Sequence, residues 1–248
     1  MIFNNIPLWL SIIAYIYIGI AILSSLIIIF DIFVRKNRQM MPIMDYVWPI
    51  TSLYLSVFGL WAYWKMGKPD AMNMKGMKMS MAEHMAKMGG HMQHKKKPFW
   101  QSIFVSATHC GAGCEIGDFI GEWAVFLLLT SFTVAGSLLF TEYAVDFIVA
   151  YALGIAFQYI PITQANPNRS KLINLKSAIK ADSLSLIAFE VGLFSWMAIF
   201  NLFLFAPGAI NPTFVVYWFM MQIGMLLGHF TSYPANWFLV KAGIKEGM

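Results

Sequence analysis

Charged side chains are scarce in this sequence. They make up 12% of its 248 residues, whereas 59% of the residues are hydrophobic. A soluble domain carries about 25% charged residues, and several apolar runs here exceed the roughly 18 residues that indicate a membrane-spanning helix. The composition therefore excludes an ordinary soluble protein. It predicts an integral membrane protein in which residues 1–248 form a single transmembrane domain.

Motifs of the common energy-coupling and hydrolytic classes are missing as well. The sequence holds no phosphate-binding Gly-Lys motif, no nucleophile elbow and no HExxH zinc motif. Only two cysteines occur, which excludes a disulfide scaffold. Nothing therefore predicts ATP-driven pumping, and a transporter or metal-handling protein is favoured over an enzyme.

The first apolar run lacks the marks of a cleaved signal. No Lys or Arg precedes it, it is too long for an h-region, and no small-x-small site follows it. We expect it to remain as the first helix. The net charge of +5 comes from Lys and Arg in the loops, so no nucleic-acid partner is expected.

The apolar runs predict an all-α, polytopic bundle of transmembrane helices with about six spans. A polar loop rich in Met, His and Lys, residues 66–97, separates the second span from the third. The predicted spans cover residues 8–34, 42–64, 99–140 (a composite segment), 143–162, 184–205 and 213–240.

The composite segment has 42 residues, which is too many for one span and barely enough for two. Four glycines loosen its first half. We therefore predict a broken or re-entrant segment near residues 99–114: a half-helix over 99–108, a non-helical turn, and a full helix from about residue 115. Such breaks often mark binding sites in transporters, since irregular backbone at membrane depth must be buried in protein or line a cavity.

Orientation follows from the basic residues. With six spans, the loops on one side hold three Lys and Arg, and the loops on the other side hold fourteen. Because cytoplasmic loops carry the excess of basic residues, we expect a multi-pass protein of the cell (inner, cytoplasmic) membrane. Both termini and the Met-rich loop would face the cytosol.

The string HCGAGC contains His109, Cys110 and Cys114. Thiolate and imidazole suit soft or borderline ions such as Cu(I) and Zn(II), and the glycines between the cysteines let the backbone turn tightly. This favours a metal site. Two alternatives stay open: a redox pair that cycles between dithiol and disulfide, and small buried residues that only pack.

Carboxylates follow directly. Glu115, Asp118 and Glu122 are spaced to share one helical face. Because intramembrane ionisable groups are costly and functional, Asp118 and Glu122 are assigned to the metal site. We predict a proton or ion path that consists of Glu115 and of charged or titratable residues in other spans. For Asp45 and Glu115 the alternative is an interfacial ion pair. The residues of this path are Asp45, Glu115, Asp146, Glu190 and His229.

The loop adds further soft donors. Nine Met occur between residues 66 and 92, and thioether ligands favour Cu(I). An amphipathic helix on an anionic lipid surface is the competing interpretation. The candidate loop ligands are Met72, Met74, Met77, Met79, Met81, His84, His91 and His94.

Several strings together resemble a known family. They are DYVWPITSLYLSVFGLWAYWKMGK, KPFWQSIFVSATHCGAGCEIGDFIGEW, ALGIAFQYIPI and SYPANWFLVKAGIKEGM. The chain resembles an uncharacterised family of bacterial and archaeal membrane proteins, known as a domain of unknown function, with a His-Cys-Gly-x-Gly-Cys-x-x-Gly-Asp block. The resemblance spans nearly the whole chain except residues 68–96. It implies a shared multi-span fold, carries over no activity, and suggests that the Met-rich loop is an insertion.

These observations favour a membrane protein that binds and transports a soft transition-metal ion. Cu(I) is the expected cargo, with zinc or another transition metal as the alternative. The expected partners are the lipid bilayer and the metal ion, and further candidates are a metal chaperone and a second copy of the chain. The competing hypotheses are a membrane thiol–disulfide oxidoreductase that uses Cys110 and Cys114, and a non-catalytic assembly factor.

Overall fold

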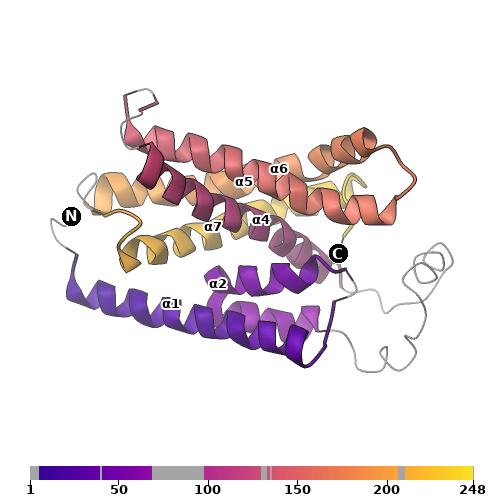
Figure 1. Ribbon diagram of the computed structural model, residues 1–248, viewed down its shortest axis with the longest axis horizontal. Coiled ribbons are helices and arrows are strands. Elements are labelled where there is room, and N and C mark those ends of the chain that lie inside the picture. The colour runs from indigo at the N-terminus through magenta and orange to yellow at the C-terminus, as the bar shows by residue number, and fades with distance from the viewer. Residues whose placement is uncertain are drawn as a thin grey trace.

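Long helices build the whole described part of the protein (Figure 1). A computed structural model describes residues 6–39, 41–68, 98–129, 133–134, 136–205 and 210–247. Within these residues there is no strand beyond one isolated bridge, which confirms the predicted all-α class. The α-helices are α1 (Leu8–Ile29), α2 (Met44–Ala62), α4 (Phe99–Leu128), α5 (Leu138–Ala165), α6 (Lys171–Ile199) and α7 (Val215–Lys241). Short π-helical segments extend α1, α2 and α6: η1 (Phe30–Val34), η2 (Tyr63–Gly67) and η4 (Phe200–Leu204).

The exterior is apolar. Three helical segments of the described chain are long and apolar enough to cross a membrane: Leu8–Val34, Leu138–Ala165 and Lys171–Leu204. Large hydrophobic side chains on these segments are exposed, for example Ile16, Ile148 and Val191. Large exposed apolar surfaces mark interaction with a partner or a membrane. The structure is thus consistent with a membrane protein.

The long helices run antiparallel in sequence order. In Figure 1, α1 begins at the left end of the bundle and α7 ends at the right end. The right end is also where α1 ends, α4 begins and α6 begins. We call it the basic end, because all the described Lys and Arg lie in the segments toward it: Arg35, Lys36, Arg38, Lys65, Lys68, Arg169, Lys171, Lys176, Lys180, Lys241 and Lys245.

Helix α2 does not cross the bundle. Its backbone breaks at Ser56, which has φ 51° and ψ −130°, a conformation that a non-glycine residue rarely adopts. The ring centroids of Trp48 and Tyr63 lie 5.8 Å apart, whereas a straight helix would separate these residues by about 22 Å. A methyl group added at Gly67 would lie 2.5 Å from the Trp48 ring. Residues 44–67 therefore form a helical hairpin that enters the bundle and returns to the basic end.

Asp31, in η1 directly after α1, fixes the returning arm of this hairpin. Its carboxylate accepts the Tyr63 hydroxyl at 2.9 Å and the Asn37 amide at 3.1 Å. Arg35 and Lys68 each lie 3.6 Å from it. A charged acceptor with several donors makes strong bonds, so one buried carboxylate holds the far arm of the hairpin against α1.

Two sequence predictions are corrected here. The segment over 42–64 was expected to span the membrane, but it turns back at Ser56. The break expected near 99–114 is absent, because α4 is one continuous helix from Phe99 to Leu128. The element that turns back is thus α2, and within the described residues five long helices run the length of the bundle. The predicted span 143–162 falls within α5, and the spans 184–205 and 213–240 match α6 with η4 and α7 except for residues 205, 213 and 214, which lie outside these helices.

The glycines of α4 form a close contact with α5 and do not break the helix. Gly113, Gly117 and Gly121 recur every four residues and face α5. A methyl group at Gly113 would lie 2.7 Å from the Gly154 Cα, and one at Gly117 would overlap the Ala150 backbone. Small residues at this spacing let two membrane helices approach closely. This packing keeps α4 helical where glycine content alone predicted a break.

We predict that Gly117→Ala destabilises the protein, because the added methyl group must push α5 away; overpacking of this kind costs about 1–3 kcal/mol. Thermal unfolding of the detergent-solubilised protein measures the change. Gly19→Ala is the control, since nothing lies within 4 Å of a methyl group there. A melting temperature for Gly117→Ala at or above that of the unmodified protein would refute the close α4–α5 contact.

Candidate functional site

Cys110 and Cys114 form a pair of thiols in the middle of α4. Both are free and fully buried, and their side chains interact. A helix holds the Cβ atoms of residues i and i+4 about 5–6 Å apart, but a disulfide needs Cβ atoms about 3.5–4.5 Å apart. The continuous helix therefore presents the two sulfurs as a dithiol on one face.

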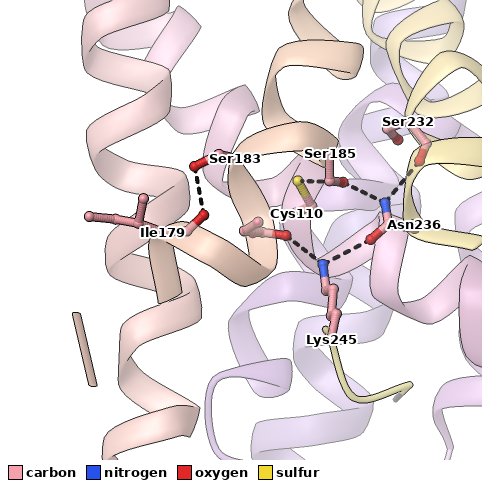
Figure 2. Close-up of polar contacts among 8 residues, drawn as sticks. Cys110, Ile179, Ser183, Ser185, Ser232, Asn236 and Lys245 are labelled. Carbon is pink, nitrogen blue, oxygen red and sulfur yellow. Dashed lines mark hydrogen bonds and ion pairs between the residues drawn. The ribbon is translucent and has the colours of Figure 1, made fainter. Parts of the chain in front are cut away.

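The first of these thiols joins a polar chain between α6 and α7. The Ser185 hydroxyl donates to the Cys110 sulfur at 3.2 Å, and the Asn236 side-chain amide donates to the Ser185 oxygen. Figure 2 shows these contacts, with α4, α6 and α7 each contributing one side chain. The thiol is thus oriented by hydrogen bonding as well as by packing.

A group of carboxyls lies next to the thiols. We call it the acidic cluster: Glu115, Asp118 and Glu122 of α4, Asp146 of α5 and Glu190 of α6. Each is buried, with between 0% and 7% of its surface exposed. Asp118 interacts electrostatically with Glu190, Glu122 and Glu115. Glu122 neighbours Asp146, and Glu190 reaches Cys114, so cluster and thiols form one continuous site.

No cationic side chain among the described residues pairs with the acidic cluster. The ion pairs within the described residues involve only Asp31, Asp45 and Asp182 as acids. Both carboxylate oxygens of Asp118 are buried without a hydrogen-bond partner. An isolated ionised carboxylate in an apolar interior is too costly to persist. Such a cluster is retained with protons or with a bound cation, and intramembrane acids of this kind mark ion and proton pathways.

The tip of the α2 hairpin meets the same region. Tyr54, two residues before the break, interacts electrostatically with Glu115 and both thiols. Its hydroxyl lies 3.1 Å from the His229 Nδ1, and Gly111 leaves room for it. Non-helical backbone at membrane depth is tolerated where protein buries it or a cavity adjoins it, and it accompanies substrate sites in transporters. The break therefore occurs beside the site, although on a different helix from the one expected.

His109 does not join the thiols. Its ring packs edge-on against Phe157 of α5 at 6.2 Å, and its charged neighbours are Asp182 and Lys245. Residues 109 and 110 point in different directions because successive helical residues are about 100° apart. Across the part of the chain that the structure describes, no three His, Cys, Asp or Glu side chains are placed to hold a metal ion together. The structure aligns Cys110, Cys114, Asp118 and Glu122 along one side of α4, but they do not form a closed chelate.

The remaining predicted residues separate into three groups. Asp45 accepts Arg38 at 3.0 Å and the Gln39 backbone N–H at 2.8 Å, so it is an interfacial ion pair at the start of α2. His229 lies among aromatic rings, 4.9 Å from Phe104, and its Nε2 has no partner. The candidate loop ligands between Met72 and His94 lie outside the described residues.

Sequence reasoning missed three members of the polar interior. Tyr54 lies at the hairpin tip, Glu142 neighbours Glu122, and Lys245 forms a fully buried ion pair with Asp182. The Lys245–Asp182 pair joins residues 63 positions apart, which no local pattern reveals. Glu142 could have been found from the sequence, since it lies within α5 one turn before Asp146.

We predict that Asp118→Asn leaves the melting temperature unchanged or raises it, because the substitution removes a buried ionisable group that has no counter-charge. Asp182→Asn is the matched comparison: it is equally buried but breaks an ion pair, which costs about 3–5 kcal/mol. Thermal unfolding in detergent compares the two variants. A larger loss for Asp118→Asn than for Asp182→Asn would show that the cluster is a structural brace.

The helices that carry this site lie in a region that matches a known protein family. The model of one family, described as a domain of unknown function (DUF4396), matches residues 99–245. The match begins with α4 and ends at Lys245, so it contains both thiols and the whole acidic cluster. No curated protein and no solved structure matches the chain. With more than half of its length matched, the chain belongs to the DUF4396 family.

Proposed function

We propose that this protein carries a soft transition-metal cation, Cu(I) foremost, across a membrane along the acidic cluster. One observation supports this most strongly: five buried carboxyls and two thiols adjoin one another, and none of the carboxyls forms an ion pair with a described Lys, Arg or His. A stable scaffold gains little from such an arrangement. A protein that must receive and release positive charge requires it.

The proposed path runs along α4. It starts at Glu142 and Glu122 near the end opposite the basic end, continues past Asp118 and Glu190, and reaches the thiols. Cys110 and Glu122 are about 18 Å apart along the helix axis. Carboxyls at this spacing let a cation pass from one to the next without crossing bare apolar space. When the ion leaves, each carboxyl takes up a proton, so the transport we propose exchanges metal for protons.

The thiols determine the choice of cargo. Thiolate ligands favour Cu(I) over harder ions, and a Met- and His-rich tract is a compositional signal for metal binding. Zinc is the second metal that thiolates bind well. The thiol–disulfide alternative is disfavoured, because the helical spacing of Cys110 and Cys114 exceeds the reach of a disulfide.

We also propose an orientation in the cell membrane. The eleven described Lys and Arg lie toward the basic end, and the other six of the chain's 17 fall in the segment between Lys68 and Pro98, which are both at that end. The positive-inside rule then assigns the basic end to the cytosol. Because α1 begins at the opposite end, the N-terminal side of α1 would face outward. This replaces the expectation that both termini are cytosolic, which depended on α2 crossing the membrane.

We predict that the purified protein binds Cu(I), and that the Cys110→Ser/Cys114→Ser double variant binds about one ion fewer per chain. Competition with a chromogenic Cu(I) chelator measures the stoichiometry. His109→Ala is the control, since His109 is equally buried on α4 but points away from the thiols, and it should keep the full stoichiometry. Equal binding by the double variant and the unmodified protein would remove the thiols from the metal site.

A second measurement separates transport from binding. In proteoliposomes, Glu190→Gln should slow Cu(I) uptake while the binding stoichiometry stays at the unmodified value, because Glu190 lies on the path and Gln cannot exchange a proton for a cation. Uptake by Glu190→Gln at the unmodified rate would contradict the path through the acidic cluster.

The orientation is tested by labelling single cysteines in a background without Cys110 and Cys114. In intact cells, an impermeant maleimide should label Asn211→Cys but leave Lys36→Cys and Glu246→Cys unlabelled until the membrane is opened. Lys36 decides the result, since a membrane-crossing α2 would place it on the side opposite Glu246. Labelling of Lys36→Cys in intact cells would therefore show that α2 is a span.

A further inference from the structure

The chain returns into the bundle after α7. Gly243 has φ +67°, and the backbone N–H groups of Ile244 and Lys245 both bond to the Leu239 carbonyl. A left-handed glycine just beyond a helix end reverses the chain direction in this way. As a result, the side chain of Lys245 is 0% exposed, although it belongs to a tail segment.

Lys245 ends a continuous polar chain. Its ammonium donates to Asp182 Oδ1 and, at 2.8 Å, to Asn236 Oδ1. The Asn236 amide donates to the Ser185 hydroxyl, which donates to the Cys110 sulfur at 3.2 Å. Figure 2 shows these contacts in sequence from the tail to the thiol. The ammonium thus lies at the basic end of the proposed metal path.

The surroundings offer more polar groups than one ammonium uses. Asp182 Oδ2 has no hydrogen-bond partner, and His109 neighbours both Asp182 and Lys245. A buried Lys–Asp pair is seldom more stabilising than apolar residues of the same volume. The arrangement is therefore poorly explained as a brace and well explained as a binding site whose occupant can change.

We infer that Asp182, Asn236 and Ser185 form a second cation site, and that the Lys245 ammonium is its resident occupant. A carboxylate and an amide carbonyl oxygen accept an ammonium group or a metal cation alike. An arriving ion and Lys245 compete for Asp182, so the tail leaves when the ion enters and returns once the ion has passed. The inference rests on the proposed function in one respect: the displacing ion is the one that the acidic cluster carries, and the Cys110 sulfur beside Ser185 supplies the soft donor that Cu(I) prefers.

Alkylation of Cys110 tests this site without any metal. In the full chain with Cys114→Ser, the inference predicts that departure of the tail opens the route by which a small water-soluble maleimide reaches Cys110. Lys245→Met keeps the length of the side chain but loses the charge, and it should raise the alkylation rate at least tenfold. The control is Lys241→Met, which removes the ammonium that lies over the Trp237 ring four residues earlier; its rate should stay at the unmodified value.

An alkylation rate for folded Lys245→Met within twofold of the unmodified protein would overturn the inference. If that variant does not fold, the Asp182→Asn/Lys245→Met double variant removes both charges together and should open the site in the same way, whereas Lys245→Arg should keep it closed. A slow rate in the double variant would also overturn the inference. Because no metal is present, these results are independent of the Cu(I) measurements, and failure of one proposal does not imply failure of the other.

Discussion

Five carboxyl groups that share an apolar interior without a counter-charge are the constraint on which the rest of the structure depends. Glu115, Asp118, Glu122, Asp146 and Glu190 come from three helices and are all buried. Were they ionised together, their mutual repulsion and lost hydration would exceed what the surrounding packing supplies. The folded state therefore needs protons or a cation in this region. Occupancy of the cluster and stability of the bundle are consequently linked, and an ion that binds there stabilises the fold that binds it.

Close helix packing makes that region possible. The glycines of α4 bring α5 near enough for Asp146 to lie directly against Gly121. Gly192 and Gly228 bring α6 and α7 together in the same way. Small residues at helix contacts let the backbones approach closely, so the carboxyls of the cluster are enclosed by packed helices and are at most 7% exposed. The hairpin of α2 closes the remaining side with Tyr54, whose ring packs against Phe189 at 6.4 Å.

Composition and apolar runs were sufficient to predict a helical membrane protein, and the spacing of Glu115, Asp118 and Glu122 was sufficient to place them together. The re-entrant element could not be located in the same way. Glycine content pointed to α4, but those glycines let α4 pack closely against α5. Only the fold reveals this contact. The real break is at Ser56, in a helix that also contains Pro49 and Gly59. Its apolar run predicted a span, but it is not among the helices of the described chain that are long and apolar enough to cross a membrane. What turns the chain back is the pairing of Trp48 with Tyr63 and of Asp31 with Tyr63, and these contacts join residues 15 and 32 positions apart.

The thiols lie at the boundary between two different electrostatic environments. On one side are five carboxyls without a cation, which attract positive charge. On the other side Asp182 is already neutralised by Lys245, so an ion gains little by moving further while that pair is intact. A cation entering from the acidic side would therefore rest at Cys110 and Cys114. Under the proposed function its onward movement would depend on the Asp182–Lys245 pair opening, so Lys245, a tail residue beyond α7, would set the direction and timing of release.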